Sequence, residues 1–173
     1  MQITLSLMPA ERLGRWLASS MSTYIGERVR SGETPGQARA NAEQSLQAFF
    51  PAGRPAPGHR VYHLMADGSP VGYLWIGPTE SEEAAWWVYD IEVDEPFRRR
   101  GVGRQAMLLA EEEARRGGAT SLGLNVFGHN QPAQGLYEQL GYTTTAIQLK
   151  MQLFGQDAPA GVDPSMTTKG SHR

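Results

Sequence analysis

A β-strand, an α-helix and a second β-strand follow one another over residues 84–126, and this run constrains the fold more than any other feature of the 173-residue chain. The first segment, AAWWVYDIEV at 84–93, is rich in the aromatic and β-branched residues that favour a central strand. Residues 103–116 have helical apolar spacing with i,i+4 ion pairs outside, and 122–126 has a strand pattern. Strands joined through a helix are normally parallel neighbours, so we expect one parallel pair in the sheet.

The other periodic segments predict further strands and helices around this pair. Asp67-Gly68 is a turn signal between two alternating segments and predicts a hairpin. Thr34-Pro35-Gly36-Gln37 has the pattern of a capping box with proline at the first helical position. We therefore expect an α/β fold of the α+β type, with a mixed, mostly antiparallel central sheet and about four flanking helices. The expected elements are strands at 2–8, 60–66, 71–76 and 142–154 and helices at 9–31, 35–50 and 132–140.

Composition excludes several classes of function. The formal net charge of -2 supplies no overall field that would attract nucleic acid or an anionic membrane, so we expect neither as a partner. The chain has no cysteine, which rules out disulfides, cysteine nucleophiles and thiolate metal sites. His59, His63 and His129 lack ligand spacing with carboxylates, so no metal is expected. Without a signal-peptide pattern or an apolar run of membrane-spanning length, the expectation is a soluble, cytoplasmic protein.

A loop rich in arginine and glycine, FRRRGVGR at 97–104, joins the strand at 84–93 to the helix at 103–116. Glycine lets the backbone approach a ligand, and the start of a helix presents unpaired N–H groups and a positive dipole. Such a loop can bind phosphate through its backbone, with charge-assisted contacts from arginine. The alternative is a solvated surface turn that the glycines merely shape.

Two other phosphate-binding patterns compete with this interpretation. The P-loop pattern GxxxxGK[ST] is absent. The dinucleotide pattern GxGxxA is present as Gly101, Gly103 and Ala106, so a Rossmann-type dinucleotide-binding protein is an alternative. Against it, residues 94–100 separate the strand from the glycines, and the next strand ends in Asn125-Val126 where that fold has an acidic residue.

Two blocks of the sequence resemble the GNAT superfamily of N-acetyltransferases. Arg98-x-x-Gly101-x-Gly103 is similar to the family's acetyl-CoA signature R/Q-x-x-G-x-G/A. The blocks have the family's separation, with a helix between them, and they cover residues 84–145. The resemblance implies the GNAT fold, in which the two parallel strands splay apart. The second block is Leu124-x-Val126-x-x-x-Asn130-x-x-Ala133-x-x-Leu136-Tyr137-Glu138-x-x-Gly141-Tyr142.

The resemblance also implies how acetyl-CoA binds as acyl donor. Its pyrophosphate would lie on backbone amides of residues 99–104, and its pantetheine arm would pair with the main chain of Ile91–Val93 between the splayed strands. The amide of Val93 would donate to the thioester carbonyl, and Asn130 would help to hold the arm. The implied cofactor-binding residues are Ile91, Glu92, Val93, Arg98, Arg99, Arg100, Gly101, Val102, Gly103, Arg104, Asn130, Ala133 and Tyr137.

Three residues are candidates for proton transfer. By the resemblance, Tyr137 has the position whose hydroxyl protonates the departing thiolate; the alternative is an ordinary packed aromatic. Asp90 and Glu92 share one face of their strand, because side chains alternate there, and partial burial would raise a carboxyl pKa toward that of a useful base. We expect Glu92 to be the base because it lies closer to the expected thioester. A water relay without a dedicated base, and a structural role for both carboxylates, remain alternatives.

These features together predict an N-acetyltransferase, an enzyme of the acyl-CoA N-acyltransferase class (EC 2.3.1). It would move an acetyl group from acetyl-CoA to a primary amine, which attacks the thioester directly. A polyamine, an aminoglycoside-like antibiotic, an amino acid, and a protein N-terminus or lysine are all candidate acceptors. The alternative from another class is a non-catalytic acyl-CoA-binding or sensing module, against which Tyr137 argues. GNAT proteins often form homodimers, but no feature of this sequence decides the oligomeric state.

The expected organisation is one acetyltransferase domain over residues 1–155. Within it, residues 1–58 supply a strand and two helices, which would border the acceptor site together with the loop at 76–84. Residues 59–155 would form the acetyl-CoA-binding core. The polar tail at 156–173 has too little apolar content to pack, and we expect it to be disordered.

Overall fold

The computed structural model describes residues 1–79, 84–149 and 151. The chain forms two compact units, Met1–Tyr142 and Thr143–Arg173. The first unit contains a five-stranded sheet and the α-helices. In chain order its elements are β1 (Ile3–Leu7), α1 (Ala10–Arg30), α2 (Pro35–Phe49), the 3-10 turn η1 (Pro51–Gly53), β2 (Arg60–Ala66), β3 (Ser69–Pro78), β4 (Ala85–Val93), the 3-10 turn η2 (Glu95–Phe97), α3 (Val102–Arg116), β5 (Ser121–Leu124) and α4 (Gln131–Gln139).

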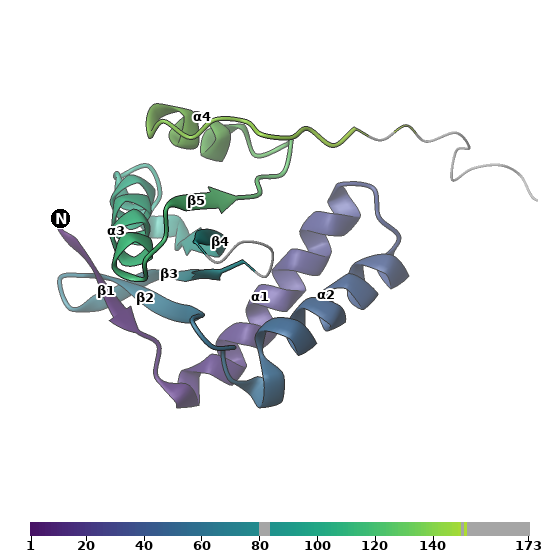
Figure 1. Cartoon of the computed structure of the whole chain (residues 1–173), viewed down its shortest axis with the longest axis horizontal. Coiled ribbons are helices and arrows are strands. Elements are labelled where there is room, and N and C mark those ends of the chain that lie inside the picture. The colour runs from purple at the N-terminus through teal and green to yellow at the C-terminus, as the bar shows by residue number, and fades with distance from the viewer. Residues whose placement is uncertain (80–83, 150, 152–173) are drawn as a thin grey trace, which may run out of the picture. The chain divides into compact units, whose positions relative to one another are not determined.

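The strands lie in the order β1-β2-β3-β4-β5. Neighbouring strands pair antiparallel except β4 and β5, which pair parallel and are connected through α3. This arrangement confirms the mixed, mostly antiparallel sheet and the expected crossover, and it differs from the parallel sheet of a Rossmann-type protein. In Figure 1, α3 lies on one side of the sheet, and α1 and α2 lie together on the other.

Each face of the sheet carries its own apolar core, because side chains alternate along a strand. On one face, Leu74 and Val88 pack with Met107 of α3, and all three are buried. On the other face, Trp75 packs against Trp16 of α1, with ring centroids 6.1 Å apart and planes at 85°. The sheet is thereby held between α3 and the α1–α2 pair.

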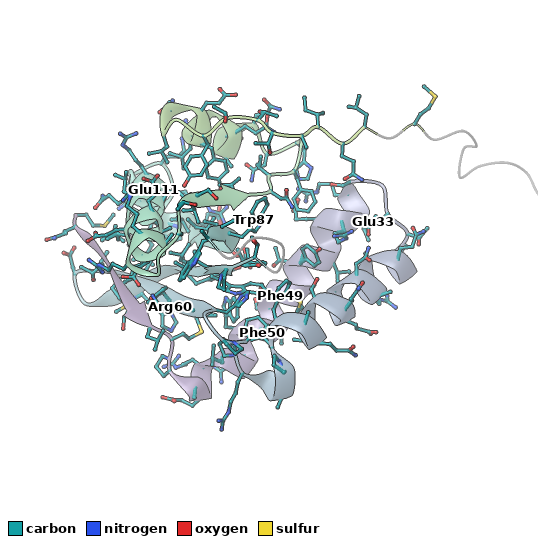
Figure 2. The ribbon with its side chains drawn as sticks, viewed as in Figure 1. Glu33, Phe49, Phe50, Arg60, Trp87 and Glu111 are labelled. Carbon is teal, nitrogen blue, oxygen red and sulfur yellow. The ribbon has the colours of Figure 1, made fainter. Side chains whose placement is uncertain are left out.

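α2 is secured at both of its ends. The side chain of Thr34 accepts from the Gln37 amide at 3.3 Å and the side chain of Gln37 accepts from the Thr34 amide at 3.2 Å, which confirms the expected capping box. Phe49 and Phe50 lie between the end of α2 and the sheet (Figure 2). Their ring centroids are 5.7 and 4.9 Å from that of Trp75, so the C-terminus of α2 is packed on the same face as α1.

One expected strand is not formed. Residues 142–149 and 151 contain no strand, so the expectation of a strand over 142–154 is wrong for them. The rest of that range, residues 150 and 152–154, lies outside the described residues. The tail at 156–173, which we expected to be disordered, also lies outside them. The side chains of Ile147, Leu149 and Met151 are 77%, 89% and 80% exposed. Apolar alternation predicts only which face a strand would bury, whereas a strand also needs a neighbour to hydrogen-bond, and these residues have no ladder partner in the described sheet.

Within the described parts of the chain, no helix combines the length and the apolar content that a membrane crossing demands.

Candidate active site

β4 loses its parallel partner halfway along its length. Its pairing with β5 ends at Val88, while its pairing with β3 continues to Val93. Successive amides of a strand point to opposite edges, and the amide of Asp94 donates to the carbonyl of Val71 on β3 at 2.9 Å. The amide of Val93 therefore points to the edge that β5 has left. The segment Ile91–Val93, named above for the pantetheine arm, lies where the sheet is open.

The arginine- and glycine-rich loop leads into the N-terminus of α3. Gly101 is the N-cap residue in a left-handed conformation, with φ at 80°, and no side chain caps the helix, so the first-turn amides are available to a ligand. Val102 is buried in the core and Arg104 is exposed. A Cβ on Gly103 would lie 3.3 Å from Cδ2 of Leu136, so this glycine permits close packing of α3 against α4. Of the two glycines, Gly101 alone has a left-handed backbone.

The three consecutive arginines differ in their contacts. Arg98 turns back onto β4: its Nε donates to the carbonyl of Val93 at 2.8 Å, and its Nη2 lies 3.5 Å from Oε1 of Glu92. Arg99 and Arg100 are exposed at the loop surface, Arg99 with φ at 61°. Arg98 therefore holds the end of β4, whereas the guanidinium of Arg100 lies over the ring of Phe97, 6.0 Å from its centroid.

A β-bulge brings two successive side chains of β4 to the same face. The register shifts between Trp75 and Ile76 of β3, which leaves Tyr89 unpaired between Val88 and Asp90. Tyr89 packs into the core under α1 and α2, and Asp90 turns to that same face. The bulge therefore directs the Asp90 carboxylate under α1, as bulges often re-aim a side chain beside a site.

The carboxylates of Asp90 and Glu92 form one hydrogen-bonded cluster with two hydroxyls. Ser20 of α1, which is 2% exposed, donates to Oδ2 of Asp90 at 2.5 Å. The hydroxyl of Tyr73 on β3 lies 3.1 Å from the same oxygen and 2.9 Å from Oε2 of Glu92. Glu92 also contacts Arg98, and its side chain is 39% exposed. The Asp90 carboxylate is thus partly buried under α1, and the Glu92 carboxylate leads to the surface.

Burial sets the protonation of this cluster. Desolvation raises the pKa of Asp90, and the nearby Glu92 raises it further, although the hydrogen bonds from Ser20 and Tyr73 act in the opposite direction. Desolvation together with the two carboxylates raises the pKa of the Tyr73 hydroxyl, which therefore stays protonated at neutral pH. Asp90 is accordingly a better proton acceptor than an ordinary aspartate.

Helix α4 carries the remaining expected site residues. Asn130 is the N-cap, and its Oδ1 accepts from the amide of Ala133 at 3.3 Å, so part of its polar capacity is used locally. Tyr137 is partly buried, with its ring centroid 5.9 Å from that of Tyr142. Burial, and secondarily the charge of Asp90, raise the pKa of Tyr137. Tyr137 is thus a protonated hydroxyl within electrostatic reach of Asp90, although the two residues come from different elements.

Ser20 and Tyr73 were not identified from the sequence. Ser20 lies in the apolar stripe of α1 between Leu17 and Tyr24, and a polar residue inside such a stripe was the available signal. Tyr73 shares the face of Trp75 by alternation, but nothing local indicates that its hydroxyl meets two carboxylates. Both contacts depend on how α1, β3 and β4 pack together.

Two tryptophans of β4 and two of the histidines named above have structural contacts. Trp86 is buried, and Trp87, labelled in Figure 2, lies over β5: a Cβ on Gly123 would be 2.2 Å from its ring. Both therefore pack on the sheet. His59 Nδ1 accepts from Nε1 of Trp75 at 3.2 Å, and His129 Nε2 lies 2.5 Å from a carboxylate oxygen of α1. Among residues 1–79, 84–149 and 151, no three His, Asp or Glu side chains are grouped to hold a metal ion.

A small pocket lies between α1 and α2, the helices expected to border the acceptor. It has a volume of about 200 Å³ and mostly aliphatic walls, with one basic and one acidic side chain among the lining residues. Part of the other expected border, residues 80–83 of the loop at 76–84, lies outside the described residues. The lining residues are Met21, Ile25, Arg39, Ala42, Glu43 and Leu46.

Several known proteins are similar to this chain in sequence. Residues 24–142 match the model of the acetyltransferase (GNAT) family. The chain is 32% identical to the uncharacterised N-acetyltransferase YycN of Bacillus subtilis, over 88% of this chain and 100% of that protein. It is 31% identical to the uncharacterised N-acetyltransferase YdgE of the same organism, over 88% and 99%.

Solved structures show the same fold. The crystal structure of Bacillus subtilis YycN matches with a TM-score of 0.80 at 30% identity, over 89% of this chain and 100% of that one. The aminoglycoside N-acetyltransferase AAC(6')-Iy, solved in complex with CoA, matches with a TM-score of 0.54 at 18% identity, over 87% and 94%. The chain therefore belongs to the acetyltransferase (GNAT) family.

Proposed function

We propose that this protein transfers an acetyl group from acetyl-CoA to a primary amine, which attacks the thioester directly. The observation that carries the proposal is a protonated hydroxyl, Tyr137, within electrostatic reach of a partly buried carboxylate of raised pKa, Asp90, which lies on β4 beyond the end of its pairing with β5. An acyl thioester is already activated, so an acid, a base and an aligned oxyanion donor are sufficient for the reaction.

The donor would be held by residues on both sides of the opening. The amides of the first turn of α3, after Gly101, would bind the pyrophosphate, with Arg99 and Arg100 at the surface of the same loop. The main chain of Ile91–Val93 would pair with the pantetheine arm, and Asn130 and Ala133 would lie beside it on α4. The Val93 amide, which points to the open edge, would donate to the thioester oxygen as its negative charge develops.

Asp90 is the better supported base. It is partly buried under α1, this burial raises its pKa, and it interacts electrostatically with Tyr137. Glu92, which the sequence favoured, instead contacts Arg98 near the surface. A carboxylate with a raised pKa is better matched to accepting a proton from an ammonium or amine near neutral pH.

Tyr137 is the proposed acid. Because its pKa is raised, its hydroxyl keeps its proton at neutral pH and can donate toward the sulfur as the thiolate leaves. The acceptor would approach from the side of α1 and α2, where the pocket near Met21 and Leu46 would take an apolar part of the amine.

The test measures release of free thiol from acetyl-CoA with a panel of amines: spermidine, kanamycin, L-lysine and a peptide with a free N-terminus. Tyr137→Phe should lower kcat by about 10²–10⁴-fold. Tyr142→Phe is the matched control, since its hydroxyl instead lies 3.5 Å from Oε1 of Glu111 on α3. Wild-type turnover in Tyr137→Phe would remove this tyrosine from the mechanism.

A binding assay separates the proposal from its alternatives. Thermal unfolding with CoA, acetyl-CoA and NAD should show stabilisation by the first two only, about 2.7 kcal/mol at 100 times the dissociation constant. Stabilisation by acetyl-CoA without thiol release from any amine would indicate a non-catalytic acyl-CoA-binding module. Stabilisation by NAD alone would contradict the acetyltransferase proposal.

A further inference from the structure

One tyrosine hydroxyl joins the enclosed carboxylate of the site to the exposed one. The oxygen of Tyr73 lies 3.1 Å from Oδ2 of Asp90 and 2.9 Å from Oε2 of Glu92. Both distances are ordinary for a hydrogen bond between a hydroxyl and a carboxylate. A phenol has one proton to donate, so with both carboxylates ionised it can serve only one of them.

A proton on Asp90 removes this conflict. The Asp90 O–H then donates to the Tyr73 oxygen, and Tyr73 donates to Glu92, so all three groups form one directed chain of hydrogen bonds. The two Tyr73 distances therefore suit a protonated Asp90. Ser20 donates to the same Oδ2 at 2.5 Å, and this bond favours the ionised form, to which Asp90 returns when it passes the proton on.

The far end of the chain reaches solvent. The side chain of Glu92 is 39% exposed, and that of its partner Arg98 is 54% exposed. Asp90 is partly buried and accepts from Ser20 of α1, which is 2% exposed. The charged and titratable groups that act on Asp90 are Glu92 on its own strand, Tyr73 on β3 and Tyr137 on α4.

We infer that Tyr73 relays the proton released by the acceptor amine from Asp90 to Glu92, from which it passes to water. This inference rests on the proposed acetyl transfer. The amine N–H bond breaks as an O–H bond forms on Asp90. That proton then moves to the Tyr73 oxygen while the original Tyr73 proton moves to Glu92, which releases it to water. Rotation of the Tyr73 hydroxyl restores the relay, and Tyr137 regains from water the proton that it gave to the thiolate. Each acetyl transfer thus releases one proton through the relay and takes one up at Tyr137.

The experiment uses Tyr73→Phe in the full chain, with the best amine of the panel above as acceptor. The ring keeps its edge contact with Trp16, at 5.5 Å between centroids, so folding should be preserved. Tyr89→Phe is the matched control: Tyr89 packs in the same aromatic core, and its hydroxyl donates to the carbonyl of Pro78 at 2.9 Å. Thermal unfolding of each variant checks that the comparison is between folded proteins.

Tyr73→Phe should lower kcat by up to about 10²-fold with KM little changed, and Tyr89→Phe should not. Added imidazole, a small proton carrier, should restore part of the lost kcat, which a purely structural defect would not allow. Glu92→Gln should give a similar loss, and the double variant Tyr73→Phe/Glu92→Gln should lose no more than either single one. If Tyr73→Phe does not fold, the imidazole response of Glu92→Gln decides the question alone.

Three results would overturn the relay: wild-type kcat in Tyr73→Phe, a loss that imidazole does not relieve, or losses that multiply in the double variant. Each of these leaves acetyl transfer by the wild-type protein intact. Absence of thiol release by the wild-type protein with every amine would instead overturn the proposed function, and the relay with it. The two failures are therefore distinguishable.

Discussion

Gly72 sits opposite Val93 in the β3–β4 ladder, at the end of β4 that carries the candidate site. Its φ is 156°, a conformation that side-chain-bearing residues rarely adopt. A Cβ placed here would lie 2.1 Å from the carbonyl oxygen of Glu92, far inside the 3.0 Å below which such contacts hardly occur. Because the obstructing atom belongs to the backbone of β4, no side-chain rotation can relieve the clash. Gly72→Ala must therefore either open the end of the ladder or displace β4.

Two costs add in this variant. Holding a non-glycine residue in a sparsely populated backbone region costs about 1–3 kcal/mol. Forcing an extra methyl group into packed structure costs about 1–3 kcal/mol more. We expect Gly72→Ala to lower the free energy of unfolding by about 2–6 kcal/mol, a large part of the 5–15 kcal/mol that is typical of a domain.

Urea unfolding followed by tryptophan fluorescence measures this loss. Gly118→Ala is the matched control, because Gly118 also has a positive φ, 87°, but its Cβ would meet nothing within 4 Å. Gly118→Ala should lose only the free energy needed to hold alanine in a left-handed conformation, about 1–2 kcal/mol. The difference between the two variants isolates the clash with β4. Equal losses in both would refute the steric reasoning, and an unchanged rate of thiol release in a folded Gly72→Ala would refute the link to the site.

Three further predictions concern burial and helix geometry. Burial raises the pKa of Asp90, so the charged carboxylate lowers the free energy of unfolding at neutral pH. Asp90→Asn should therefore stabilise the protein at that pH. The gain should be about 1.4 kcal/mol for each unit by which NMR titration finds the pKa of Asp90 raised. The gain should vanish in urea titrations below the ordinary value of 3.8, and a gain independent of pH would contradict this origin. Burial lowers the pKa of His59, so the wild-type protein should lose stability as the pH falls below the ordinary value of 6.5. His59→Gln can still accept from Trp75 and should lose less stability over this range. Parallel curves of unfolding free energy against pH for the two proteins would disprove the assignment. Gly14→Ala, in α1 with open space around the added Cβ, should raise the free energy of unfolding by about 0.5–1 kcal/mol, whereas a destabilisation would show that α1 does not tolerate the methyl group.

Local patterns were enough to predict most elements of the first unit. The capping box at Thr34, the helix after Gly101 and the crossover from β4 to β5 are all confirmed within a few residues. The reason is that periodicity, helix caps and turns depend on residues only a few positions apart in the chain. The alternation at 142–154 is also a local pattern. It was misleading because it carries no information about a pairing partner.

The composition of the site depended on contacts between distant elements. The bulge at Tyr89 directs Asp90 under α1, where it meets Ser20 and the Tyr73 hydroxyl, 70 and 17 residues away in the sequence. The sequence alone therefore determined the elements, the loop before α3 and the family resemblance. Only the tertiary structure decided which carboxylate is enclosed and which reaches solvent, because strand register and helix packing set burial, and burial sets the pKa that acid–base chemistry uses.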